Sequence, residues 1–313
     1  MKKKLAAFVL HLLPVIVHTP NDNPMPLNRA GPGNRPALWP LLLLVLGMGM
    51  MAPVWAKGSL SGISDPCAGP SSLLALLDRP TVGDSTCVVK PGDAVLETGW
   101  ARYALSGQSG HAFGYPQGEL RFGLPDQNEF VFLPPNLSRQ VTPMPGGGSQ
   151  TLTGGSASVM GIKHEFGYNA RWIWAGETLF TLPSGSPTYG SAATGYAVNG
   201  IIGYSLTSSV ALTLMLGVTH LAQAADVQGG AYYWSVNPDL VLTWETTQNF
   251  QFYLEAYGQN HTGPGQGAGY DADGGVQYLL TPRFEVDAEI GQRLSGNLGG
   301  WSHYFGVGAG FLF

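Results

Sequence analysis

Charged residues are scarce in this chain. Asp, Glu, Lys and Arg make up 11% of its 313 residues, whereas typical soluble proteins contain about 25%. So few charges cannot cover the surface of a soluble protein of this length. The mean hydropathy of +0.06 is nevertheless too low for a bundle of membrane helices. A transmembrane β-barrel satisfies both observations, because its lipid-facing and lumen-facing residues alternate and their hydropathies cancel.

Long apolar runs are also lacking, with one exception at residues 37–56. Basic residues precede this run, Leu41–Leu46 form its hydrophobic centre, and Val54-Trp55-Ala56 places small residues where a signal peptidase cuts. We therefore interpret residues 1–56 as a signal peptide region. A permanent helical anchor is the alternative, because the run is just long enough to span a bilayer.

A second basic and apolar leader, at residues 2–17, precedes that region and is separated from it by a Pro- and Asn-rich stretch. From this duplication we infer that translation starts at Met25. After the signal, we expect residues 57–93 to form a short periplasmic segment and residues 94–313 to form the barrel.

Basic residues and cysteines are few as well. Beyond residue 56 the chain holds 10 Lys and Arg against 19 Asp and Glu, so it offers no basic surface for nucleic acid. Its two cysteines, Cys67 and Cys87, match no zinc spacing, and an isolated pair in an oxidising compartment favours a disulfide. We expect this disulfide to hold the segment against or inside the periplasmic mouth, with Asp78 paired to Arg79.

The dominant sequence pattern from residue 94 onward has a period of two. In Val210–Val218 every second residue is Val or Leu, and Ala211, Thr213, Met215 and Gly217 lie between them. Strict alternation over nine residues predicts a strand with one apolar face. A short turn joins this strand to the similar segment 196–206, which predicts a hairpin.

Repetition of this unit predicts about twelve strands, and an even number is typical of bacterial barrels. Connections are expected to alternate between short turns and longer loops rich in Gly, Pro and Ser, at residues 105–114 and 135–155 among others. The fold class is therefore an all-β, antiparallel, up-and-down transmembrane barrel. Its strands are expected near 94–104, 115–124, 128–134, 156–166, 169–181, 195–206, 210–220, 231–244, 250–258, 270–280, 283–294 and 301–313.

The last strand carries the most specific pattern. From Trp301 to Phe313 one face holds bulky residues and the other holds mainly Gly, Ser and Tyr. Outer-membrane barrels resemble this closely, because their assembly machinery reads a final amphipathic strand that ends in Phe. We therefore interpret Phe311 and Phe313 as the assembly signal. The alternative, an edge strand of a β-sandwich, would leave large aromatic side chains facing water.

Motifs for catalysis and ligand binding are weak. Residues 47–52 fit a loose dinucleotide fingerprint but lie inside the export region, without a preceding strand. Asp271-Ala272-Asp273-Gly274 begins like a calcium loop but lacks the later ligands. There is no HExxH pair and no GxSxG elbow. We therefore predict that the protein is not an enzyme and has no cofactor and no metal site.

Several short motifs resemble a family of outer-membrane transporters first associated with the meta-pathway of phenol degradation. The resemblance begins at Asp78-Arg79-Pro80-Thr81 and covers most of residues 78–313 in order. Two positions depart from the family pattern, at Pro183-Ser184-Gly185 and at Pro125-Asp126. The resemblance implies a channel for small solutes, including hydrophobic or aromatic ones. Its other motifs are Asp84-Ser85, Pro91-Gly92, Leu96-Glu97-Thr98-Gly99, Glu119-Leu120-Arg121-Phe122-Gly123-Leu124, Gly161-Ile162-Lys163, Glu255, Asp273-Gly274-Gly275 and Phe313.

Charged residues on the polar faces of the strands are expected to line the lumen. Eleven acids and four bases belong to this set, so the pore should prefer cations or neutral solutes over anions. Pairing of the bases with acids across the lumen is an equally supported reading. The expected partners are outer-membrane lipids, the barrel assembly machinery and a small solute, in the outer membrane of a Gram-negative bacterium. The set contains Glu97, Glu119, Arg121, Glu129, Lys163, Arg171, Glu177, Asp239, Glu255, Asp271, Asp273, Glu285, Asp287, Glu289 and Arg293.

Two other functions are consistent with the same sequence. A barrel plugged by its own residues could serve as a structural or interaction module of the cell envelope. A hydrolase could carry its site at the rim of the barrel, although no sequence motif supports one.

Overall fold

The structure, a computed structural model of the chain, describes residues 65–313. The expected signal peptide region at residues 1–56 and the expected start at Met25 lie outside this range. No helix between residues 65 and 313 is long and apolar enough to cross a membrane.

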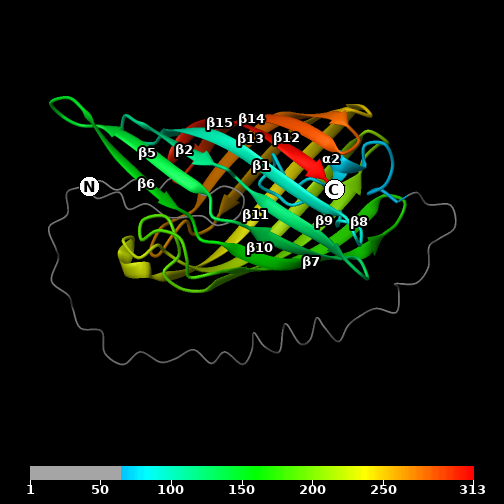
Figure 1. Cartoon of the computed structure of the whole chain (residues 1–313), viewed down its shortest axis with the longest axis horizontal. Helices are drawn as coiled ribbons and strands as arrows, with labels where there is room; N and C mark the ends of the chain where they lie inside the picture. Colours follow the sequence, from blue (N-terminus) through cyan, green and yellow to red (C-terminus); the bar gives the residue numbers. More distant parts are fainter. Residues whose placement is uncertain (1–64) are drawn as a thin grey trace, which may run out of the picture. The chain divides into compact units, whose positions relative to one another are not determined.

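A single antiparallel sheet closes on itself to form a barrel (Figure 1). Closure is made by β1 and β15, which pair from Val95 opposite Leu312 to Leu105 opposite Trp301. Twelve strands form the wall of the barrel. The structure divides them into fifteen segments, because three of the twelve strands are interrupted. The strands are β1 (Ala94–Leu105), β2 (His111–Tyr115), β3 (Glu119–Leu124), β4 (Asn128–Leu133), β5 (Leu137–Pro143), β6 (Ser149–Gly155), β7 (Val159–Tyr168), β8 (Trp172–Thr181), β9 (Gly195–Ser205), β10 (Val210–Ala222), β11 (Tyr232–Thr247), β12 (Phe250–Gln259), β13 (Gly269–Thr281), β14 (Phe284–Ser295) and β15 (Trp301–Leu312).

The three additional segments, β2, β5 and β6, arise because three strands of the barrel are each interrupted once. Gaps at residues 116–118, 134–136 and 156–158 separate β2 from β3, β4 from β5 and β6 from β7. Proline accounts for two of these gaps, since it has no N–H to donate to a ladder. The expected loop at residues 135–155 was therefore wrong: β5 and β6 form a hairpin there, which projects beyond the neighbouring strands (Figure 1).

The two ends of the barrel have different connections. Short turns at residues 125–127, 169–171, 206–209, 248–249 and 282–283 lie at the end where the barrel begins and finishes, which we call the turn end. Longer connections lie at the opposite end, the loop end, and one of them contains the short helix η1 (Gln228–Gly230). This alternation of turns and loops is the one that the sequence predicts.

Burial follows the period of two along the strands. On β10, Leu214 and Leu216 are 47% and 52% exposed, whereas Met215 between them is 6% exposed. Apolar side chains cover the outer surface, with Trp172 and Trp244 near the turn end and Trp234 near the loop end. Apolar residues flanked by aromatic rings at both ends are typical of a surface in contact with lipid.

The last strand differs from the expected pattern at one residue. Trp301 is buried at 2% exposure and packs edge-on against Tyr304, instead of sharing the outer face. The ladder shifts register next to it, between Ala104 and Leu105, and this irregularity turns the side chain inward. Phe311 stacks on Phe284 with ring centroids 4.5 Å apart, and Phe313 is exposed.

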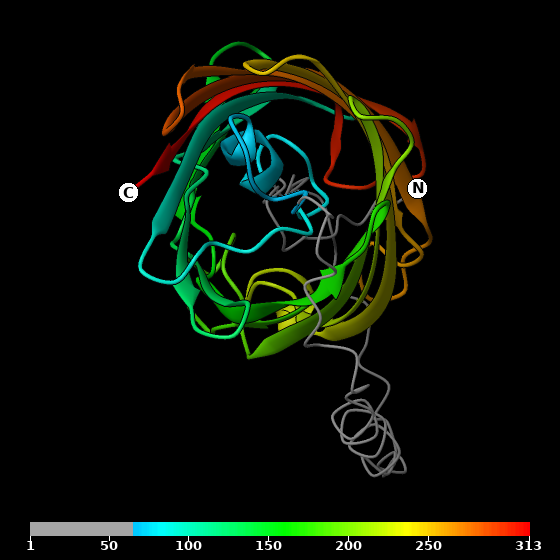
Figure 2. The ribbon, with the colours of Figure 1, turned by 90° about the vertical axis from the view of Figure 1, so that its right-hand side faces the viewer.

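Residues 65–93, which we call the inner segment, lie inside the ring of strands at the turn end (Figure 2). The segment contains the helix α2 (Ser72–Leu76) and the Cys67–Cys87 disulfide, which confirms the predicted bond. Its leucines form an apolar cluster with wall residues such as Val95 and Leu279. Burial of this cluster and the crosslink together allow a short segment to hold a defined position.

Candidate functional site

The inner segment is attached to the wall by buried charges, beginning with Asp78. The Asp78 carboxylate lies 3.0 Å from Nη1 of Arg121 and 3.2 Å from Nζ of Lys163. It also accepts a hydrogen bond of 2.6 Å from the backbone N–H of Ser85. The three charged side chains are fully buried. Because an unpaired charge inside a protein is costly, each of these groups requires the others.

Two wall carboxylates extend the same network to the backbone of the inner segment. Glu97 accepts the N–H of Arg79 at 2.6 Å, and Glu129 accepts the N–H of Val89 at 2.7 Å. Both carboxylates also pair with Arg121, at 2.9 and 3.3 Å. Arg121 therefore neutralises acids of the wall and of the segment together.

Arg79 makes the second attachment, through its side chain to β14. Its Nη2 lies 3.1 Å from Asp287 and 3.5 Å from Glu289. Burial alone would lower the pKa of this guanidinium, but the two carboxylates outweigh burial and raise the pKa. The side chain occupies a slot between Gly99 and Gly308, where an added Cβ would lie 2.4 and 2.5 Å from guanidinium atoms. The Arg79 side chain fits into this slot because both positions are glycine and have no Cβ.

A third attachment uses the backbone of residues 82–83. Glu255 accepts the N–H groups of Val82 at 2.9 Å and of Gly83 at 2.7 Å. Asp239 packs against the same glycine, where a Cβ would lie 2.9 Å from its carboxylate oxygen. Close approach of backbone to wall is possible because Gly83 has no side chain.

Most of the charged residues that the sequence places in the lumen are buried in the structure. Two of the fifteen are not fully buried. Arg293 is half-buried and contacts Ser106, and Arg171 is exposed. The strand begins at Trp172, so Arg171 lies in the turn, exposed, and donates to Tyr204 Oη at 3.1 Å. The buried residues are Glu97, Glu119, Arg121, Glu129, Lys163, Glu177, Asp239, Glu255, Asp271, Asp273, Glu285, Asp287 and Glu289.

Sequence reasoning missed what these groups bind. The expected pairing of Asp78 with Arg79 was wrong, because each of the two pairs with the wall. The presence of eleven acids but four bases was a usable signal, since so many buried acids need additional donors. The inner segment supplies one arginine and several backbone N–H groups.

Within the described residues 65–313, one group of carboxylates has ligand spacing for a metal ion. Oxygen atoms of Asp78, Glu97 and Glu119 lie within 4.8 Å of one another. The Arg121 guanidinium contacts both Asp78 and Glu97 and so supplies the positive charge at this position. The arrangement is that of an ion-pair network.

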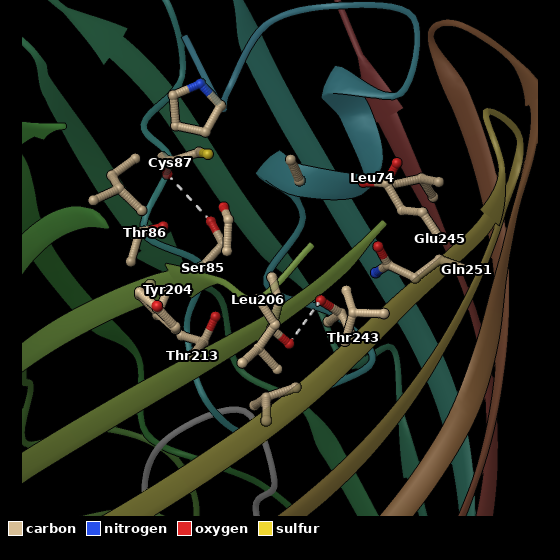
Figure 3. Close-up of a pocket in the computed structure, with 18 of the residues that line it drawn as sticks. Leu74, Ser85, Thr86, Cys87, Tyr204, Leu206, Thr213, Thr243, Glu245 and Gln251 are labelled. Carbon is tan, nitrogen blue, oxygen red and sulfur yellow. Dashed lines mark hydrogen bonds between the residues drawn. The ribbon is translucent and has the colours of Figure 1, made fainter. Parts of the chain in front are cut away.

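A cavity of about 600 Å³ lies in the lumen beside the inner segment. It lies between residues 74–87 and the turn-end halves of β9, β10 and β11, and Figure 3 shows labelled side chains from both sides around it. Exposed turn residues at 206–208 belong to its lining, so it reaches the surface at the turn end. Toward the loop end lies a buried apolar cluster that includes Tyr189, Val227 and Leu298.

A protein-family model for the "MetA-pathway of phenol degradation" matches residues 35–309. The chain belongs to this family. No curated protein sequence matches it significantly.

Solved structures of outer-membrane channels and porins are similar to this member of the phenol-degradation family to different degrees. An outer membrane channel from Pseudomonas putida F1 superposes with a TM-score of 0.55 and 10% identity, covering 73% of this chain and 98% of the other. The NanC porin gives a TM-score of 0.45 at 12% identity, covering 70% and 98%. The KdgM porin in complex with disordered oligogalacturonate gives 0.42 at 10% identity, covering 70% and 99%. At such low identity the first likeness shows the fold alone.

The motifs that resemble the phenol-degradation family are brought together by the structure. Asp78 comes from the first motif, and Arg121 and Lys163 come from two later ones, yet these three side chains form one ion-pair group. Glu97 and Glu255 belong to further motifs and accept backbone N–H groups of the inner segment. Motifs far apart in the sequence therefore share one structural task, which is to hold residues 78–83 in the lumen.

Proposed function

We propose that the protein is an outer-membrane channel for small solutes whose lumen is narrowed by the inner segment. The observation that carries this proposal is the cavity of about 600 Å³ that reaches the turn end beside the segment. A barrel of twelve strands leaves more interior than its own side chains fill, unlike a barrel of eight. The apolar outer surface with aromatic residues at both ends supports a position in a lipid bilayer.

Membrane orientation follows from the connections. Bacterial barrels have short turns on the periplasmic side and longer loops outside. On this basis the turn end and the inner segment face the periplasm, and the cavity opens toward it. A solute that enters from outside must then pass the apolar cluster of the loop end, which the loops 182–194, 223–231 and 296–300 help to form.

Single-channel recording in a planar lipid bilayer tests the proposal. Purified, heat-modifiable protein should give discrete current steps in KCl, and a variant lacking residues 65–91 should give larger steps because the lumen is wider. The proposal is wrong if fully assembled protein of both kinds conducts no current. That result would instead favour a structural barrel, for which the buried apolar cluster of the loop end is the supporting observation.

A further inference from the structure

The inner segment contacts ion-paired wall carboxylates on one side and borders the cavity on the other. On the charged side, Glu97, Glu129, Glu255, Asp287 and Glu289 all contact the segment through ion pairs or backbone N–H groups. Carboxylates engaged in this way are covered and cannot line an open path. The acidic wall expected from the sequence is therefore used to hold the segment.

The opposite wall, from β9 to β11, borders the cavity and differs in chemistry. Among residues 65–313, two acidic and two basic residues belong to the lining, so their formal charges cancel. Of these, Arg79 is paired with Asp287, and Glu245 accepts the Ser71 hydroxyl at 3.2 Å. Arg171 lies at the exposed rim. Asp84 is buried and already interacts within the protein. Inside the rim, a charged solute therefore meets no free opposite charge to replace its hydration.

Hydroxyl and amide groups make up the polar part of the lining. Within residues 65–313, the Thr86 and Thr213 hydroxyls form no hydrogen bond, and the Thr243 hydroxyl makes only a long one of 3.5 Å to the carbonyl of Ala211. Gln251 donates through its nitrogen to Gln277 at 2.7 Å. Figure 3 shows Thr86, Thr213, Thr243 and Gln251 around the same space.

Apolar side chains complete the cavity. Leu74 and Leu77 of the inner segment and Val241 of the wall belong to the lining. Such a lining can bind a solute that carries both O–H groups and C–H faces. The hydroxyls of the cavity would bond the O–H groups, and the apolar side chains would contact the C–H faces. A hydroxyl can donate and accept at once, so threonine hydroxyls can bind such a solute in either sense.

We propose that this cavity binds neutral solutes that carry several hydroxyl groups, such as simple sugars and polyols. This inference rests on the proposed channel function and names its solute class. The volume of about 600 Å³ lies inside the ~300–1,000 Å³ range of small-molecule sites and accommodates a monosaccharide with water. Selection arises from hydroxyls on the open wall that are not engaged by the protein and from the absence of net charge there.

Block of the KCl current by added sugars tests this assignment. Glucose should reduce the single-channel current at lower concentrations than glucosamine or glucuronate, which have similar size but carry a positive or a negative charge. The double variant T213V/T243V should raise the half-blocking glucose concentration, by roughly fivefold for each lost hydrogen bond. Thr86→Val, on the inner segment, should act in the same direction and leaves the barrel strands unaltered.

Thr151→Val is the matched control, because Thr151 is exposed on β6 outside the cavity. Its half-blocking concentration should equal that of the parent. Equal block by the charged analogues, or unchanged block in both cavity variants, overturns the solute assignment while the current itself upholds the channel. Absence of any current from assembled protein overturns the channel and the assignment together.

Discussion

Replacing Asp78 by Asn should release the inner segment while preserving the shape of the side chain. Asp78 is fully buried and pairs with Arg121 at 3.0 Å and Lys163 at 3.2 Å. Removing one partner of a buried ion pair costs about 3–5 kcal/mol. Both bases still contact Glu129, so we expect the lower value, about 3 kcal/mol. At about 1.4 kcal/mol per factor of ten, the detached population should rise roughly 100-fold.

Hydrogen exchange measures this release directly. The N–H groups of Val82, Gly83 and Val89 are bonded to wall carboxylates and exchange with solvent only when the segment detaches. In D78N their exchange should accelerate by about two orders of magnitude. Asp93→Asn is the matched control, because no hydrogen bond or ion pair of the Asp93 side chain occurs within residues 65–313.

Unchanged exchange at Val82 and Gly83 in D78N would refute the reasoning, since it would mean that the ion pairs do not hold the segment. Equal acceleration in D93N would refute it as well, because the effect would then arise from any lost charge near the segment.

Three further changes have defined outcomes. Reduction of the Cys67–Cys87 bond removes a constraint worth about 3 kcal/mol in the chain-entropy model, and should increase both segment exchange and the frequency of open current steps. Gly308→Ala places a methyl group against the Arg79 guanidinium and should displace it, giving faster segment exchange with an unchanged melting temperature of the barrel strands. Leu214→Arg puts a charge on the outer face and should lower the unfolding free energy in lipid vesicles by about 2–4 kcal/mol, without altering segment exchange.

The strand pattern was readable from sequence because burial in a barrel is a local property. Each inward residue of a strand is followed by an outward one, so a period of two over Val210–Val218 is enough to identify both faces. Short turns and long loops alternated in the sequence as they do in the structure. The β5–β6 hairpin was missed because proline and glycine in residues 134–155 resemble a loop, although this hairpin pairs through backbone groups with little apolar content.

Arg171 shows the limit of period-two reasoning at strand ends. Alternation places Arg171 on the polar face of a strand. In the structure, however, Arg171 belongs to the turn at residues 169–171, outside the ladder, and its side chain is exposed. Trp301 shows the same limit, since a register shift beside it reverses the direction of its side chain. The period of two predicts which side of the sheet a residue faces only where the hydrogen-bonded ladder is regular.

Twelve strands, the outer apolar surface and the Cys67–Cys87 bond were determined by the sequence alone, because alternation and cysteine count act over short distances. Attachment of the inner segment was decided only by the tertiary structure. Asp78 meets Lys163 across 85 residues, and Arg79 meets Asp287 across 208. Such contacts depend on closure of the barrel, which brings every strand around one lumen. Closure therefore determines which acids hold the segment and which wall stays open to a solute.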